Sequence, residues 1–192
     1  MHSSRWLPLL VAVVGFARAA PIHAQDGDWD VVLNGRAFHV GAKKKWNEEN
    51  WGIGVEREFN SSGRWVKVAL ANGFKDSLEE PSYMAGGGIK RRFRKSSDGM
   101  YVDVGVVAFF MTRQDVDHNR PFPGALPAVT FGSKRVALNV TYMPEIAVDR
   151  VTNSKLRDPD MDGVFFIQLK LDAGLFGFGG RRQFLAAASE SE

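Results

Sequence analysis

The sequence of 192 residues contains no cysteine, and beyond its first twenty-odd residues it has no long apolar run. The absence of cysteine excludes a disulfide framework, a thiol nucleophile and a thiolate metal site. A helix that crosses a bilayer needs about 20 predominantly apolar residues, so a helical membrane protein is also excluded. With 44% hydrophobic and 24% charged residues, the chain has the composition of a single folded domain.

The longest apolar stretch lies at the N-terminus. Arg5 is followed by the apolar residues 6–16, then by small residues and the step Ala24–Gln25. This order is typical of a cleaved secretory signal peptide, which we predict at residues 1–24. The alternatives are cleavage after Ala20 and a buried N-terminal helix. Cleavage after Ala24 removes two arginines and no acid, which leaves 23 basic (25 − 2) and 22 acidic residues. A net charge of +1 gives no reason to expect a nucleic-acid partner.

Helical periodicity is nearly absent from the mature chain, and short segments alternate apolar with polar residues instead. In one segment Val102, Val104 and Val106 share a face, and Asp103 and Gly105 lie on the other. Such alternation predicts eight strands, at residues 36–45, 51–59, 64–75, 83–94, 100–113, 126–133, 135–143 and 163–171. Before them, residues 25–35 are expected to form a short N-terminal segment. After them, residues 172–192 form a C-terminal extension.

The connections between these segments indicate an antiparallel order. Residues 60–63 and 96–99 are tight turns that end in glycine, whereas residues 115–124 and 145–163 are longer and more polar. An even number of strands, several of them 9–11 residues long, predicts an all-β fold, an eight-stranded antiparallel up-and-down transmembrane β-barrel. We assign it residues 36–171 and place it in the bacterial outer membrane.

The main rival is a periplasmic β-sandwich or lipocalin-like barrel, whose apolar face would point inward. Aromatic residues near strand ends favour a lipid-facing surface; they are Trp46, Trp51, Trp65, Tyr101 and Tyr142.

Acyl-transfer chemistry needs a hydroxyl, a proton acceptor and a charged partner. Asp76 and Ser77 close the third predicted strand, and His39 lies on the first. In a regular strand neighbouring residues point to opposite faces, so Asp76 and Ser77 can share a site only where the strand gives way to a loop. Residues 78–81 supply that loop. By itself, a trio of this composition does not identify a catalytic site.

At these residues the sequence resembles the lipid A palmitoyltransferases of the PagP family, and the resemblance runs from about Phe38 to Leu171. Its most specific motif is Phe-Lys-Asp-Ser at 74–77, followed by Ala85-Gly86 and Gly88. The supporting motifs are Phe38-His39, Trp51-Gly52 with Gly54, the segment from Glu56 to Ala71, Thr112-Arg113, Leu126-Pro127 and Thr141-Tyr142-Met143-Pro144.

The resemblance implies an outer-membrane acyltransferase that moves a palmitoyl group from a glycerophospholipid to a hydroxyl of lipid A. It assigns the catalytic residues as His39, the proton acceptor, Ser77, a polar or nucleophilic hydroxyl, and Asp76, their electrostatic partner. Gly88 would form the floor of the acyl pocket and set its length. Arg113 could meet a lipid A phosphate. The N-terminal helix of the family would be reduced here to a remnant around Trp29 to Leu33.

The resemblance also implies a lateral lipid gate. Pro127 and Pro144 stand at the ends of the sixth and seventh predicted strands, and proline cannot donate a ladder hydrogen bond. The partners expected are the phospholipid acyl donor, the lipid A acceptor and outer-membrane lipid, and we expect a monomer with no cofactor and no metal. Two alternatives stay open: a lipid A deacylase or phospholipase, and a non-catalytic barrel that serves adhesion or integrity.

Overall fold

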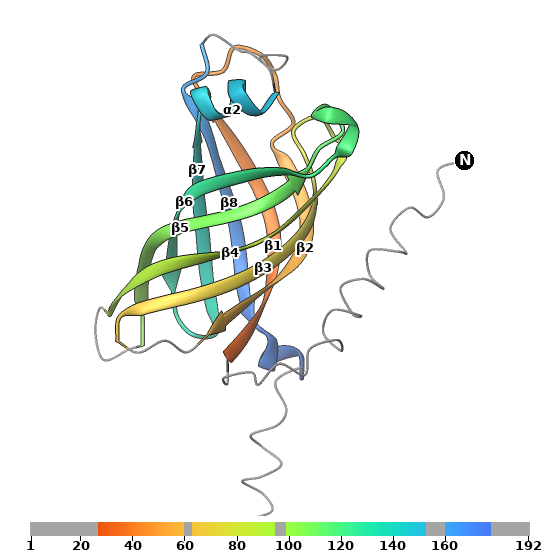
Figure 1. Ribbon diagram of the computed structural model, residues 1–192. Helices are drawn as coiled ribbons and strands as arrows, with labels where there is room; N and C mark the ends of the chain where they lie inside the picture. Colours follow the sequence, from red (N-terminus) through yellow and green to blue (C-terminus); the bar gives the residue numbers. More distant parts are fainter. Residues whose placement is uncertain (1–26, 60–62, 95–98, 153–159, 178–192) are drawn as a thin grey trace, which may run out of the picture.

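A computed structural model of the protein describes residues 27–59, 63–94, 99–152 and 160–177, and these residues form a closed antiparallel barrel (Figure 1). Each strand pairs with the next, and the last pairs with the first, so the described sheet has no open edge. The elements are β1 (Gly27–Val40), β2 (Glu49–Phe59), β3 (Trp65–Lys75), β4 (Pro81–Arg94), β5 (Tyr101–Thr112), η1 (Asp117–Asn119), β6 (Phe122–Gly132), β7 (Val136–Pro144), α2 (Glu145–Thr152), β8 (Gly163–Asp172) and η2 (Ala173–Phe176). The prediction of an eight-stranded up-and-down barrel is confirmed.

The N-terminal part of the barrel differs from the prediction. β1 begins at Gly27, so residues 27–35 are strand where a helix remnant was expected. The reason is a period of two: Asp30 and Val32 face the interior, whereas Trp29 and Leu33 are exposed. The predicted signal peptide lies outside the described residues, as does most of the C-terminal extension, of which η2 is described.

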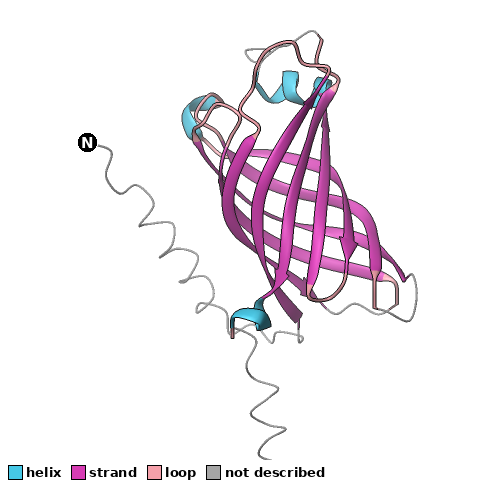
Figure 2. Cartoon of the chain, turned by 180° about the vertical axis from the view of Figure 1, so that it is seen from behind, coloured by secondary structure: helices cyan, strands magenta, loops and turns pink. Residues whose placement is uncertain are grey.

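The two ends of the barrel are built differently (Figure 2). One end, here called the turn end, carries the short connections between β2 and β3, β4 and β5, and β6 and β7. The other, the loop end, carries the short segment 76–80 and the three longer segments 41–48, 113–121 and 145–162. Helix α2 lies at the loop end and was not foreseen, because its eight residues follow a strand with no clear helical pattern.

The distribution of side chains is inverted relative to a water-soluble protein. Exposed aromatic and aliphatic side chains cover the strands; examples are Trp51, Ile53, Val104, Val106, Phe110, Phe131, Leu138 and Phe165. Charged and polar side chains are buried inside; examples are Glu56, Lys90, Asp103, Thr130, Asn139 and Lys170. An apolar exterior and a polar interior are the pattern of a barrel surrounded by lipid. The soluble rival, which needs an inward apolar face, is therefore excluded.

Two of the five aromatic residues expected at the lipid interface are inside. Tyr101 lies on the inner face of β5 and is 8% exposed, and Trp46 packs on His39 in loop 41–48. Trp51 and Trp65 do lie on the outer surface. Among the described residues, no helix is long and apolar enough to cross a membrane.

Candidate active site

The carboxylate of Asp76 is buried at the loop end, in the turn that follows β3. It accepts hydrogen bonds from the backbone amides of Leu78 at 2.8 Å and Glu80 at 3.1 Å. It also accepts one from the hydroxyl of Ser82, at 3.1 Å. Nη2 of Arg113 lies 3.7 Å from the same carboxylate. Asp76 therefore fixes the conformation of the turn that presents Ser77.

Ser77 lies where two cavities adjoin, since its side chain lines both. Its hydroxyl makes no hydrogen bond with the described residues, whereas its carbonyl accepts one from the backbone amide of Asn47 at 3.3 Å. The side-chain amide of Asn47 also donates to the carbonyl of Asp76, at 3.2 Å. Loop 41–48 thus forms hydrogen bonds with the backbone of both Asp76 and Ser77. The serine hydroxyl itself is available to a substrate.

His39 reaches the site from the inner face of β1. Its imidazole stacks on the indole of Trp46, with ring centroids 5.5 Å apart and 14° between the planes. His39 and Ser77 both line the smaller cavity. The structure therefore brings His39 and Ser77 together around one space. Among the described residues, the Asp76 carboxylate contacts the turn, Ser82 and Arg113. Asp76, His39 and Ser77 therefore do not form a chain of hydrogen bonds like that of a serine hydrolase triad.

The larger cavity, of ≈ 170 Å³, extends down the barrel interior. Asp76, Ser77 and Arg113 line it at the loop end. Its apolar lining is supplied by β3 to β6, through Leu70, Phe74, Met84, Val107, Phe109, Met111, Leu126 and Ala128. Its other boundary is polar and contains Glu56, Lys90 and Asn139. The space is suited to an extended apolar group with its polar end beside Ser77.

Gly88 lies on the inner face of β4 but is not among the residues that line this cavity. A Cβ atom at Gly88 would lie 2.7 Å from the carbonyl oxygen of Val106, 3.0 Å from Cγ2 of Val107 and 3.2 Å from Cγ2 of Val68. Val107 does line the cavity. Gly88 therefore borders the cavity indirectly, because a side chain there would push against Val107.

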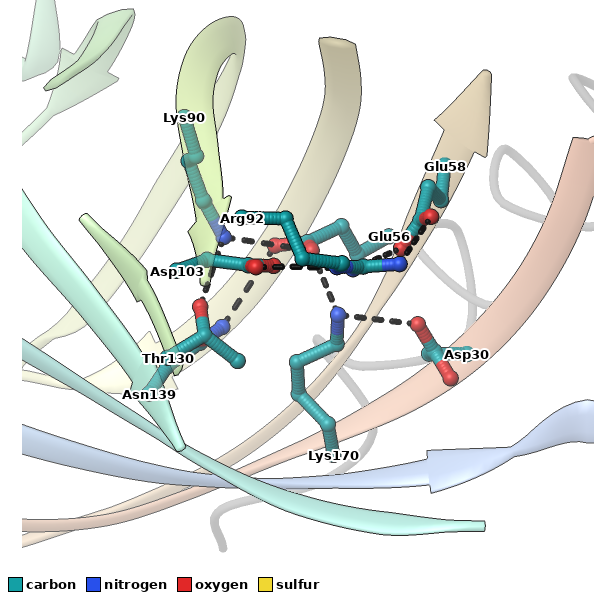
Figure 3. Close-up of polar contacts among 9 residues, drawn as sticks. All are labelled: Asp30, Glu56, Glu58, Lys90, Arg92, Asp103, Thr130, Asn139 and Lys170. Atoms are coloured by element: carbon teal, nitrogen blue, oxygen red, sulfur yellow. Dashed lines mark hydrogen bonds and ion pairs between the residues drawn. The ribbon is translucent and has the colours of Figure 1, made fainter. Parts of the chain in front are cut away.

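Beyond the cavity, an ionic network fills the interior toward the turn end (Figure 3). Nζ of Lys170 lies 2.7 Å from Glu56 and 2.9 Å from Asp30. Nζ of Lys90 lies 3.4 Å from the same glutamate and donates to Thr130 at 3.0 Å. Glu56 is therefore shared by two lysines from different strands.

Arg92 continues the network. Its guanidinium donates two hydrogen bonds to Glu58, at 2.9 and 2.8 Å, and two to Asp103, at 2.9 and 2.8 Å. Such bidentate pairs are geometrically specific. Paired charges thus fill the interior around Glu56 and Arg92 (Figure 3), and Glu56 and Lys90 form a polar boundary of the large cavity.

The pairing of β6 with β7 stops partway along both strands. The last paired residues toward the loop end are Ala128 and Thr141. Pro127, the next residue of β6, pairs with β5, and Pro144 pairs with β8. Leu126 and Met143, from the unpaired parts of the two strands, both line the large cavity. The two prolines therefore flank a side opening in the ladder, next to the apolar cavity.

Three residues of this region carry no signal in the sequence that marks them as part of a site. Ser82 and Asn47 hold the Asp76–Ser77 turn, and Trp46 packs on His39. A serine or asparagine in a loop carries no distinguishing signal, and Trp46 was taken for an interfacial aromatic. Among the described residues, no group of three or more His, Cys, Asp or Glu side chains is placed to hold a metal ion.

Residues 22–153 match the family model described as antimicrobial peptide resistance and lipid A acylation protein PagP. Three curated relatives carry the name lipid A acyltransferase PagP. That of Methylobacillus flagellatus is 34% identical over 98 residues, which are 50% of this chain and 52% of the relative. That of Bordetella pertussis is 30% identical over 126 residues, or 62% of this chain and 68% of the relative. That of Legionella pneumophila is 31% identical over 150 residues, or 73% of this chain and 76% of the relative.

Of solved structures, the outer membrane protein Ail of Yersinia pestis in a phospholipid bilayer nanodisc is similar with a TM-score of 0.38 and 8% identity, over 76% of this chain and 99% of that one. The family model covers well over half of the sequence and includes His39, Asp76, Ser77 and Arg113. This chain therefore belongs to the PagP family.

Proposed function

We propose that this chain is an outer-membrane acyltransferase that moves a palmitoyl, or similarly long, acyl chain from a glycerophospholipid to a hydroxyl of lipid A. The observation that carries the proposal is the apolar cavity inside a lipid-facing barrel, with Ser77 at its loop end. The names of the relatives support the reaction class. Because one chain encloses the cavity, we propose that it acts as a monomer.

The side opening between β6 and β7 supports a route for lipid. An acyl chain could pass from the bilayer between Pro127 and Pro144 into the cavity, with no crossing of the intact ladder. Its ester carbonyl would then stop beside Ser77, and its methyl end would lie among the apolar side chains of β3 to β6. We propose that these two prolines maintain the gate.

The depth of the barrel is consistent with a long chain. Gly88 pairs with Val68, eight positions (76 − 68) before Asp76 along β3. With a rise of about 3.3 Å per residue and a strand tilt of about 40°, it lies about 20 Å below Asp76 along the barrel axis. An extended palmitoyl chain has about this length. We propose that Gly88 limits chain length through its contact with Val107.

The proposed roles of the polar residues follow from their contacts. His39 accepts the proton of the attacking hydroxyl, and Ser77 is that hydroxyl or binds beside it. Asp76 acts through the turn that it holds. Arg113 uses Nε and Nη2 for Asp115, so its Nη1 is available for a lipid A phosphate.

Mass spectrometry of lipid A tests the proposal. Cells that express the chain should gain lipid A heavier by one palmitoyl group, and well-folded Ser77→Ala and His39→Ala variants should lose that gain. Release of free fatty acid with no acylated lipid A would indicate a deacylase or phospholipase. An unchanged gain in both variants would overturn the assigned site, and a membrane-inserted barrel with no lipid turnover would indicate a non-catalytic role.

A further inference from the structure

The smaller cavity is lined by His39, Trp46, Ser77 and Arg113 together with apolar side chains. Its volume is ≈ 30 Å³, which holds one small polar group but not an acyl chain. His39 comes from β1, Ser77 follows β3, and Trp46 lies in loop 41–48. Three separate parts of the chain thus enclose a space for a single group next to the serine hydroxyl.

The indole Nε1 of Trp46 is buried, and none of the described residues accepts a hydrogen bond from it. A buried N–H group without an acceptor is unfavourable and uncommon in native proteins. Neither its place in the sequence nor its stacking on His39 gives this N–H group a partner. A substrate oxygen that enters the cavity would supply the acceptor that the Trp46 N–H group lacks.

Trp46 is held firmly in this position. One face of its ring stacks on His39, and Nζ of Lys44 lies 4.3 Å from the ring centroid. The next residue, Asn47, is bonded to the carbonyls of Asp76 and Ser77. The N–H group is thus oriented before any substrate arrives, which is what makes a donor effective toward charge that develops during a reaction.

Arg113 is the other permanent donor that lines this cavity. Its Nε and Nη2 are taken by the carboxylate of Asp115, and Asp76 lies 3.7 Å from Nη2. Two carboxylates therefore already offset its charge. The indole N–H of Trp46 is neutral and has no acceptor among the described residues, so no carboxylate competes with a substrate oxygen for it.

We infer that the Trp46 indole N–H binds the carbonyl oxygen of the acyl ester and stabilises the negative charge that it acquires during transfer. The inference rests on the acyltransferase function proposed above. An attacking hydroxyl forms a C–O bond to the ester carbon, its proton passes to His39, and the carbonyl electron pair moves onto oxygen. When the carbonyl re-forms, the bond to the glycerol oxygen breaks and that oxygen takes the proton from His39. Because the N–H group binds the oxyanion more strongly than the neutral carbonyl, it accelerates the reaction rather than tightening substrate binding.

An isosteric replacement tests this directly. In the full mature chain, 3-benzothienylalanine at position 46 replaces the N–H group by sulfur and keeps the shape that stacks on His39; Trp46→Phe is the second variant. Apparent kcat and KM are measured for palmitoyl transfer from dipalmitoyl phosphatidylcholine to lipid A in mixed micelles. We expect kcat to fall about 10²-fold in both variants, with KM unchanged. The same replacements at Trp51, which is 60% exposed on the outer face of β2, should leave both constants unchanged.

The outcomes separate this inference from the proposed function. If the unsubstituted chain transfers palmitate and the isosteric variant matches its kcat, the oxyanion role is overturned. A raised KM with an unchanged kcat also overturns it, because the N–H group would then contribute to substrate binding and would not stabilise the transition state specifically. Absence of transfer by the unsubstituted chain overturns the proposed function and this inference with it. Heat-modifiable gel migration establishes that each variant is folded.

Discussion

The hydroxyl of Ser82 donates a hydrogen bond to Oδ2 of Asp76 at 3.1 Å, and the two residues are only 0% and 1% exposed. With two backbone amides and Arg113, the hydroxyl completes a set of partners that surrounds this carboxylate. In the structure Asp76 is thus a residue that positions the serine loop, and Ser82 is one of the groups that hold it.

Replacement of Ser82 by alanine should disturb the loop without touching the substrate. Loss of a hydrogen bond to a buried carboxylate should lower the free energy of unfolding by about 2 kcal/mol. Because the Asp76–Ser77 turn is then held less firmly, palmitoyl transfer should slow several-fold. Urea unfolding in detergent micelles and the transfer rate measure the two effects.

Ser133→Ala is the matched control. Among the residues that the structure describes, its hydroxyl bonds only with Val136, in a turn at the opposite end of the barrel. Stability should therefore change by less than about 0.5 kcal/mol, and the transfer rate should not change. Wild-type activity in Ser82→Ala would contradict the positioning role assigned to Asp76.

Gly88→Met should shorten the acyl chain that is transferred. The new side chain must enter space that Val68 and Val107 already border, and Val107 lines the cavity. We expect the product profile to move to acyl groups several carbons shorter, as read by mass spectrometry of lipid A. Ala85→Met, at an exposed position on the outer face of the same strand, should keep the palmitoyl profile. An identical profile in both variants would exclude Gly88 as the chain-length determinant.

Pro127→Val should narrow the opening between β6 and β7. Valine restores a backbone N–H group next to the last paired residue, Ala128, and can extend the ladder toward the loop end. Transfer from lipid in an intact bilayer should slow several-fold, whereas transfer in detergent micelles should change little. Pro121→Ala, in the exposed loop before β6, serves as the control. Equal slowing in bilayers and micelles would count against a gate.

Lys170→Met should destabilise the barrel strongly. The substitution leaves Asp30 unpaired and removes one of two lysines from Glu56, inside a closed interior. Breaking a buried ion pair by removing one partner costs about 3–5 kcal/mol, which urea unfolding would reveal as a lower midpoint. Lys43→Met breaks an exposed pair with Asp160 and should cost no more than about 1 kcal/mol. Similar losses in both variants would mean that the network adds no more stability than a surface pair.

Several features of the fold could be predicted from residue order because each depends on local periodicity. Val102, Val104 and Val106 alternate with Asp103, and the structure places them on the lipid-facing and interior sides of β5, respectively. Strand positions followed from the same rule. Residues 27–35 also alternate and belong to β1, which begins at Gly27; the helix remnant expected there came from the resemblance to the family and not from periodicity.

The candidate site was predictable only in part. His39, Asp76 and Ser77 follow from their chemistry and from the resemblance to a family. Because β3 ends at Lys75, Asp76 and Ser77 lie in a loop, where both can line the same cavity. The direction of the Asp76 carboxylate was not predictable, because Ser82 and Arg113 reach it from elements that only the barrel brings together.

The sequence by itself determined that this protein is built of alternating strands and is not a helical membrane protein, because beyond its first twenty-odd residues it has no long apolar run. Only the structure decided that the apolar face of these strands points outward, to lipid. The tertiary structure decided what lies inside. Closure of the sheet places Trp46 on His39 beside Ser77, and it sets an apolar cavity next to the buried network of Glu56, Lys90 and Lys170. The physical reason is that alternation sets which face a side chain occupies, whereas strand register and closure set which side chains meet across the barrel.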